Sequence, residues 1–178
     1  MKVNFQLLGI GAGVLAGEWA LRRAVNAIGK TGLGLLWAPG ENYTWDDLTT
    51  TNTGLANVPG PVGMVKVRAL AHNILDPLWD AVGPVTVTSG YRSPAVNRKV
   101  GGDSSSQHMT GEAADIKVPG YTALQLAKKI HDLGLPYDKL IWYPASLGGH
   151  VHVSYTKTPR GDSRHAAVGG GYPPWSFA

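Results

Sequence analysis

The stretch SSSQHMTGEAADIKV, residues 104–118, places one histidine and one aspartate seven residues apart among small side chains. Its second half, AADIKV, alternates as a short strand does, which puts Ala114 and Ile116 on the opposite face from Asp115. His108 precedes this strand in a turn-rich segment. Imidazole and carboxylate are both ligands of divalent metals, so the stretch predicts two thirds of a metal site if a third ligand comes from elsewhere in the chain.

The composition limits what such a site can contain. The chain has 178 residues, of which 43% are hydrophobic, enough for one domain with a core. It has no cysteine, so any metal must be held by histidine and carboxylate. The net charge of +4 is mild, and no run of lysine or arginine alternates with aromatic residues. The sequence therefore gives no indication of a nucleic-acid partner.

Apolar spacing predicts the elements around this stretch. YTWDDL begins a helix with Thr44 as cap, residues 64–82 form a helix that ends at Gly83, and Thr122 caps a helix that runs to residue 134. Strands are expected over residues 84–90, 113–118, 139–145 and 150–156, the last two joined by the turn SLGG. The order predicts an α+β fold with a small antiparallel sheet and flanking helices.

The two ends of the chain differ from this central part. Residues 1–40 are predicted as a glycine-rich helical extension, because LLGIGAGVLAG at residues 7–17 is uncharged and places a glycine at every fourth position. Three interpretations remain open: a helix packed on the domain or a partner, a membrane anchor, or the apolar part of a cleaved signal. Residues 41–157 are predicted as the main domain and residues 158–178 as an irregular Gly/Pro-rich tail.

The third ligand must come from the remaining histidines. His72 and His131 fall within helical patterns, and His165 lies alone in the tail. We take His150 and His152, two positions apart on a predicted strand, to lie on opposite faces, and expect at most one of them to share a cleft with His108. Two imidazoles and one carboxylate with an open fourth position would be a catalytic zinc arrangement. On spacing alone, incidental surface polarity remains the alternative.

The segment SQHMTGEAAD fits the pattern S-x-H-x-x-G-x-A-x-D and resembles the zinc D-Ala-D-Ala carboxypeptidases and endopeptidases of peptidase family M15. VTSGYRSPAVN, residues 87–97, is similar to the strand and loop before this motif in the family. KLIWYPASLGGHVHVSY, residues 139–155, is similar to its closing strand pair. The resemblance covers about residues 43–156 and implies the fold that these enzymes share with the hedgehog signalling domain.

The resemblance implies a Zn²⁺ site made by His108, Asp115 and His152, the last being the histidine of the V-H-V-S segment. Arg92 matches an arginine that faces substrate in the family and stabilises negative charge near the scissile carbonyl. The structural alternative for Arg92 is an ion pair, for which Asp103 is a candidate.

Three further positions are less determined. Ser106 either contacts substrate or only closes the loop by a hydrogen bond. Gly111 and Ala113 are interpreted as making space around the metal. Tyr143 either donates a hydrogen bond to the transition state or is simply a half-buried aromatic residue.

One expected residue is missing from the sequence. The family's general base is a carboxylate shortly before the last histidine ligand, and here Gly149 and Tyr143 occupy the expected positions. His150 would be the base if it turns into the cleft, since imidazole titrates near neutral pH. Alternatively Asp138 or Glu112 reaches the cleft, or the protein binds zinc and peptide without efficient turnover.

The resemblance therefore implies a zinc metallopeptidase that cleaves stem peptides or cross-links of bacterial peptidoglycan, in phage lysis or entry or in wall remodelling. The alternative is a catalytically weak zinc-binding module that serves a virion or binds the wall. Either function implies a place in the cell envelope, the periplasm or a virion, with membrane or virion association through residues 1–40 as a further expectation.

Overall fold

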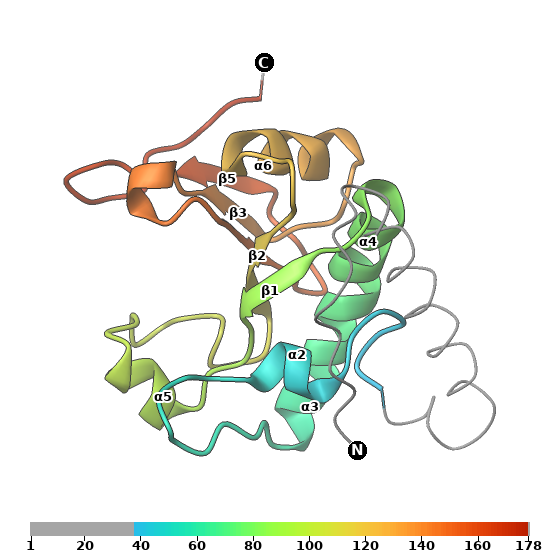
Figure 1. Ribbon diagram of the computed structural model, residues 1–178, viewed down its shortest axis with the longest axis vertical. Helices are drawn as coiled ribbons and strands as arrows, with labels where there is room; N and C mark the ends of the chain where they lie inside the picture. The colour runs from blue at the N-terminus through green and yellow to red at the C-terminus, as the bar shows by residue number, and fades with distance from the viewer. Residues whose placement is uncertain (1–37, 178) are drawn as a thin grey trace, which may run out of the picture. The chain divides into compact units, whose positions relative to one another are not determined.

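A five-stranded sheet with the order β1-β2-β4-β3-β5 forms the centre of the computed structural model, which describes residues 38–177 (Figure 1). The strands are β1 (Thr86–Ser89), β2 (Ala113–Lys117), β3 (Lys139–Trp142), β4 (Val151–Ser154) and β5 (Asp162–His165). Neighbouring strands are antiparallel except β5, which runs parallel to β3. This architecture confirms the predicted α+β fold with a small, mainly antiparallel sheet.

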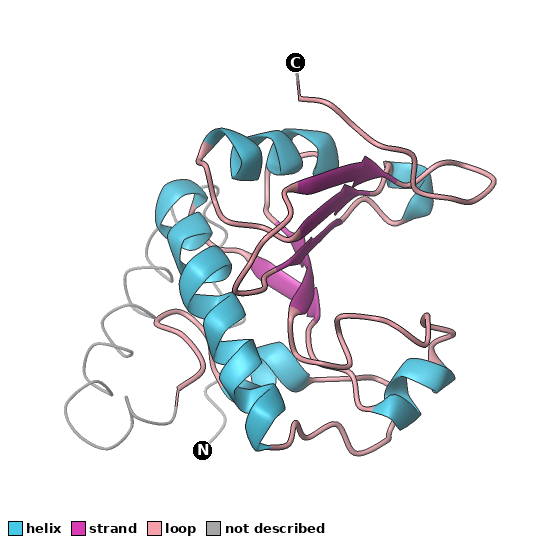
Figure 2. Cartoon of the chain, turned by 180° about the vertical axis from the view of Figure 1, so that it is seen from behind, coloured by secondary structure: helices cyan, strands magenta, loops and turns pink. Residues whose placement is uncertain are grey.

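The helices follow the predicted spacing with local differences (Figure 2). They are α2 (Trp45–Thr49), α3 (Pro61–Leu70), the π-helical turn η1 (Ala71–Leu75), α4 (Asp76–Val82), α5 (Pro94–Lys99), α6 (Ala123–Asp132) and the short 3₁₀ turn η2 (Ala145–Leu147). The first long helix is continuous from α3 through η1 to α4. Its wider π turn ends two residues before Pro77, whose ring has no N–H and would clash with the carbonyl of residue 73 in a regular helix.

Side-chain caps fix where two helices begin. Thr44 accepts from the backbone of Asp47, whose carboxylate in turn accepts from the backbone of Thr44, and Thr122 and Gln125 form the same reciprocal pair at α6. Both predicted caps are thus confirmed as capping boxes. Because these side chains use backbone groups that the first turn leaves unpaired, the helix starts are set locally by the sequence.

The sheet separates the core from the functional face. Leu140, Val151 and Val153 are fully buried, and α6 lies against β3 and β4 with Leu126 and Ile130 buried. Because side chains alternate along a strand, the residues between these positions point to the other face. The alternation therefore places the apolar side chains against the core and points Asp115, Ile141 and His152 toward a cleft.

Two elements lie where the sequence analysis predicted none. The turn-rich segment after Arg92 contains α5, which Ser93 caps by accepting from the backbone of Val96, with Pro94 at its first position. The tail contains β5, whose four residues, DSRH, are too few and too polar to show the apolar alternation that indicates a strand. The first long helix also begins at Pro61 rather than at Met64.

The predicted glycine-rich extension, residues 1–40, lies almost entirely outside the described residues. Its proposed helix, anchor or signal therefore stays a prediction, as do the domain limits. Within residues 38–177, no helix combines the length and apolar character needed to cross a membrane.

Candidate metal centre

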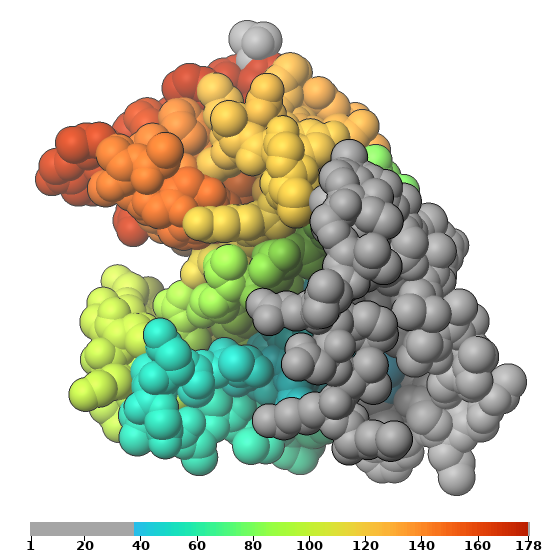
Figure 3. Space-filling model, viewed as in Figure 1, coloured from blue at the N-terminus to red at the C-terminus, as the bar shows by residue number. Residues whose placement is uncertain are grey.

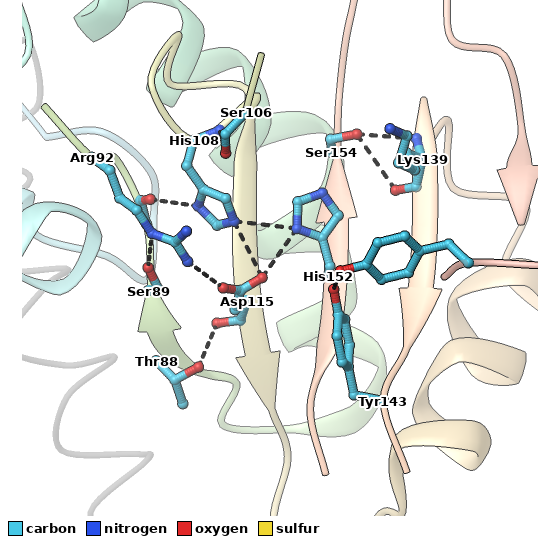
Figure 4. A network of polar contacts seen from close by, with 12 residues as sticks. Thr88, Ser89, Arg92, Ser106, His108, Asp115, Lys139, Tyr143, His152 and Ser154 are labelled. Carbon is cyan, nitrogen blue, oxygen red and sulfur yellow. Dashed lines mark hydrogen bonds and ion pairs between the residues drawn. The ribbon is translucent and has the colours of Figure 1, made fainter. Parts of the chain in front are cut away.

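Three side chains from two strands and one loop converge on one face of the sheet (Figure 4). Asp115 lies on β2 and His152 on β4, where the two residues are direct cross-strand partners. His108 lies in the loop before β2 and is buried, with 3% of its surface exposed. The structure therefore brings together the three residues that the sequence nominated as metal ligands, and they form the one such cluster found within residues 38–177.

The donor atoms of this triad form a nearly equilateral triangle. His108 Nε2 lies 3.2 Å from Asp115 Oδ1 and 3.2 Å from His152 Nδ1, and the last two atoms are 3.0 Å apart. Ligands of a tetrahedral zinc ion, bound at roughly 2.0–2.1 Å, lie about 3.3 Å from one another. The three atoms therefore match one triangular face of a zinc tetrahedron, and the fourth position stays open toward the cleft.

The environment of His108 selects the form that binds a metal. Its Nδ1 lies 2.7 Å from the carbonyl oxygen of Gly90, which can only accept, so Nδ1 carries the proton. Nε2 is then the nitrogen that faces Asp115 and His152 and is left for a metal. The backbone carbonyl orients the ring as a second-shell partner does.

Arg92 orients the Asp115 carboxylate, as the Gly90 carbonyl orients the ring of His108. Its Nη2 donates to Asp115 Oδ2 at 2.7 Å and its Nε donates to the Ser89 hydroxyl at 2.8 Å. Oδ2 is thus occupied, and Oδ1 is left for the metal. The alternative ion pair of Arg92 with Asp103 is wrong, because the loop that carries Asp103 places its carboxylate on Ser105 instead.

The protonation states also suit a cation. Burial raises the pKa of Asp115, but the contacts with His108 and His152 outweigh it and hold the pKa well below its ordinary value. Burial is the main reason that the pKa of His152 is lowered. At neutral pH the pair is therefore a carboxylate and a neutral imidazole, the forms that bind zinc.

Sequence comparison places these ligands in a known family. Residues 44–154, which include all three ligands, match the peptidase M15 family. The chain belongs to this family. It is also 34% identical over 101 residues to the zinc D-Ala-D-Ala carboxypeptidase of Streptomyces albus G, an alignment that covers 51% of this chain. The match spans 37% of that relative's length, little more than a third.

The M15 triad lines a cleft of about 680 Å³. Figure 3 shows the surface hollowed between the yellow-green segment near residue 100 and the orange and red segments that follow residue 140. The loop before β2 forms one wall, and β3, the turn after it and the tail form the other. Besides the ligands, the described lining includes Arg92, Asp103, Ser106, Gln107, Lys139, Ile141, Tyr143, His150, Arg160, Asp162, Arg164 and Tyr172.

His150 and His152 both line this cleft, so the expectation that only one would do so is wrong. Residues two apart along a strand share a face, and His150 directly precedes β4. Its ring stacks on Tyr143 with centroids 4.1 Å apart, and burial lowers its pKa. The Tyr143 hydroxyl donates to that of Tyr172 at 3.3 Å. His150 thus lines the same cleft as the metal ligands, and burial favours its neutral form.

Neither alternative carboxylate reaches the cleft. Asp138 is buried and accepts from Arg160 and Gln107, and Glu112 pairs with Lys66 at 2.9 Å. Neither acid is part of the cleft lining, and both are committed to these structural contacts. Among the described residues that line the cleft, Asp103 and Asp162 are the acids besides Asp115, and each is hydrogen-bonded to a neighbour.

One glycine near the site acts differently from the expectation, and a second has a role that was not expected. A Cβ on Gly111 would lie 2.8 Å from the Gly63 carbonyl oxygen, so Gly111 makes room for α3 rather than for the metal. Gly90, which sequence reasoning did not single out, supplies the carbonyl for His108 and stands two residues before Arg92. Ser106 accepts weakly from the His108 backbone at 3.4 Å and lines the cleft, so both of its predicted roles remain compatible with its position.

Proposed function

We propose that the protein is a zinc peptidase that hydrolyses peptide bonds in the stem peptides or cross-links of bacterial peptidoglycan. The observation that carries the proposal is the triangle of His108 Nε2, Asp115 Oδ1 and His152 Nδ1 in the lining of an open cleft. Membership of the M15 family and the similarity to a zinc D-Ala-D-Ala carboxypeptidase support the substrate class.

The chemistry follows from groups on the same face of the sheet. A zinc ion held by the triad would polarise a peptide carbonyl and activate water for attack. Arg92 lines the cleft, and its Nη1 has no partner among the described residues, so this nitrogen is available to stabilise the negative charge that develops on the carbonyl oxygen. Ser89 and Asp115 already hold the Arg92 guanidinium in place, so this group needs little reorganisation when the negative charge develops.

His150 is the proton-transfer group in this proposal. Its Nδ1 faces the turn at Gly148, where a Cβ would approach it to 3.2 Å, which leaves Nε2 for the cleft. His150 Nε2 would accept a proton from the attacking water and deliver it to the leaving amine. Stacking on Tyr143 fixes the ring plane, so Tyr143 acts by positioning His150 and by shaping the cleft.

A second candidate function is a zinc-binding module of a virion or of a wall-binding protein, with little turnover. The specific observation in its favour is that Asp138 and Glu112 are paired elsewhere and no unpaired carboxylate lines the described cleft. Phage lysis or entry and a place in the envelope or virion are part of the proposal for either function.

Digestion of purified peptidoglycan by the zinc-loaded protein, with mass spectrometry of the released fragments, separates the two functions. We expect the wild type to release peptide fragments, His108→Ala and His150→Ala to release none, and His72→Ala, which removes an exposed histidine on η1, to behave as wild type. A wild-type protein that holds one zinc ion and releases nothing would contradict the peptidase and leave the binding module. Release by His150→Ala at the wild-type rate would contradict only the role of His150.

A further inference from the structure

The floor of the cleft continues beyond the metal ligands across the sheet. His152 on β4 is the cross-strand partner of Ile141 on β3, which is in turn the partner of Arg164 on β5. One step along the same face, Lys139 is the partner of Asp162. Because all four of the residues from β3 and β5 line the cleft, the outer half of the cleft is a surface with charged side chains on both strands.

The arginines of this surface already have carboxylate partners. Arg92 pairs with Asp115 at 2.7 Å, Arg164 Nε with Asp162 at 2.8 Å, and Arg160 with the buried Asp138 at 2.6 Å. Each pair is close to neutral as a unit. A ligand carboxylate at Arg160 or Arg164 would share a guanidinium that already has a carboxylate partner, and the Nη1 of Arg92 is assigned to the carbonyl oxygen of the scissile bond.

Lys139 differs from these arginines. Its ammonium forms no ion pair or side-chain hydrogen bond among residues 38–177, although its side chain is partly buried in the cleft lining. Its backbone is fixed, because the Lys139 N–H donates to the hydroxyl of the fully buried Ser154 at 3.0 Å (Figure 4). The backbone that carries this cation is therefore held in the sheet, on the strand next to that of His152.

Lys139 shares the cleft with the metal centre and with the loop of residues 101–107, since all three line the same cavity. Its strand, β3, is the direct neighbour of β4, which carries His152. A peptide bound in the cleft would therefore pass beside Lys139.

We propose that Lys139 binds a free carboxylate of the peptide substrate, on the part of the substrate that lies over β3 and β5. This inference rests on the proposed peptidase function and names the chemistry that the cleft selects. A partly buried ammonium without a partner gains a charge-assisted hydrogen bond from a carboxylate, and the flanking arginines, held by their own acids, leave Lys139 as the available donor. The carboxylate is either the chain terminus or that of an acidic residue near the scissile bond.

Matched peptides test this subsite. Three versions of one stem peptide are compared: unmodified, with its C-terminal carboxylate amidated, and with its internal acidic residue amidated. Cleavage by the zinc-loaded protein gives kcat/KM, and calorimetry gives the binding of the same peptides. The variants are Lys139→Gln, Lys139→Arg and the control Lys117→Gln, which removes a lysine of β2 that does not line the cleft.

We expect one amidated peptide to lose about tenfold or more in kcat/KM and in binding with the wild type, which identifies the carboxylate. In Lys139→Gln, kcat/KM and binding of the unmodified peptide should fall by the same factor. The peptide whose amidation identified the carboxylate should show no further loss with this variant. Lys139→Arg should retain the preference, and Lys117→Gln should match the wild type.

Equal losses for all three peptides in Lys139→Gln, or no preference in the wild type, would overturn the carboxylate subsite. The binding measurement keeps the two proposals distinct. A binding preference that depends on Lys139 without any cleavage would support the subsite and contradict the peptidase, whereas cleavage without the preference would do the reverse. Neither binding nor cleavage of any peptide would overturn both.

Discussion

Arg92 holds two groups at once, and this makes it a positioning residue for the metal centre. Its guanidinium donates one hydrogen bond from Nε to the Ser89 hydroxyl and one from Nη2 to Asp115 Oδ2. A lysine at this position has one ammonium and can reach one of these partners at a time. The positive charge near the carboxylate would be kept, but the orientation of Asp115 would be lost.

We therefore expect Arg92→Lys to weaken zinc binding about tenfold, as the loss of an outer-shell partner does in other metal sites. Competition with a chromophoric chelator measures the affinity without requiring activity. Arg98→Lys, an exposed change on α5, is the control and should bind zinc as the wild type does. An unchanged zinc affinity in Arg92→Lys would show that the Arg92 guanidinium is not needed to orient Asp115.

At the scale of single residues, the sequence predicts the ligands well and their orientation poorly. His108, Asp115 and His152 follow from a motif, because the family pattern specifies residue types at fixed spacing. The contact from Gly90 to His108 joins positions 18 residues apart through a backbone carbonyl, and no side-chain pattern records it. The shared face of His150 and His152 follows from the period of two along a strand, so the sequence contained this signal and the expectation of opposite faces misapplied it.

At the scale of elements, α2 and the end of β1 meet with no space between them. A Cβ on Gly90 would lie 2.1 Å from the carbonyl oxygen of Leu48, and the next residue, Tyr91, donates to that same oxygen at 2.8 Å. The contact is between two backbones, so neither side can rotate away. This packing holds the Gly90 carbonyl where His108 needs it.

We expect Gly90→Ala to lower the free energy of unfolding by about 2 kcal/mol or more, because overpacking against backbone forces a shift of β1 or α2. Thermal unfolding of the zinc-free protein measures this. Gly60→Ala is the matched control, since a Cβ there meets nothing within 4 Å and the residue only caps α3. Equal melting temperatures for the two variants would contradict the tight junction.

The sequence predicts elements where local signals are strong. Thr44 and Thr122 carry the capping pattern, and the alternation of VHVS gives β4. It does not predict β5, because DSRH has no apolar alternation and becomes a strand only by pairing with β3. The segment DSRH forms a strand because β3 pairs with it and not because of its own β propensity. Propensity therefore does not predict edge strands of this kind.

At the scale of the whole molecule, Asp138 joins the tail to the rest of the sheet. Its carboxylate accepts from Arg160, Gln107 and Thr156, and its backbone carbonyl accepts from the N–H of Asp162 at the start of β5. Hydrogen bonds from Arg160 are the main reason that the pKa of Asp138 falls from an ordinary 3.8 to about 2. The folded state therefore prefers the ionised carboxylate more strongly than the unfolded chain does.

A carboxyl whose pKa is lowered on folding stabilises the protein above the unfolded value and loses this effect as pH falls through the folded value. For Asp138 the contribution is about 2 kcal/mol at neutral pH, lost between about pH 4 and pH 2. We expect Asp138→Asn to unfold more easily than the wild type at pH 7, with a difference that narrows toward pH 2. Urea unfolding with chelator present measures both proteins without the metal.

Asp132→Asn controls for this experiment, because Asp132 forms an exposed pair with Lys128 on α6 and should change stability little at any pH. If the difference between Asp138→Asn and the wild type were the same at pH 7 and near pH 2, the ionised carboxylate would not be the stabilising species.

The strand β5 also determines how the sheet ends toward other molecules. Without it, the outer edge would be β3, whose sequence KLIW is apolar and whose unpaired backbone groups would be a template for a strand from another chain. β5 replaces that edge with DSRH, and residues 173–175 cover part of it, with Pro174 bridged to Arg164. Proline has no N–H to offer an incoming strand. The tail thus protects the sheet against edge-to-edge aggregation.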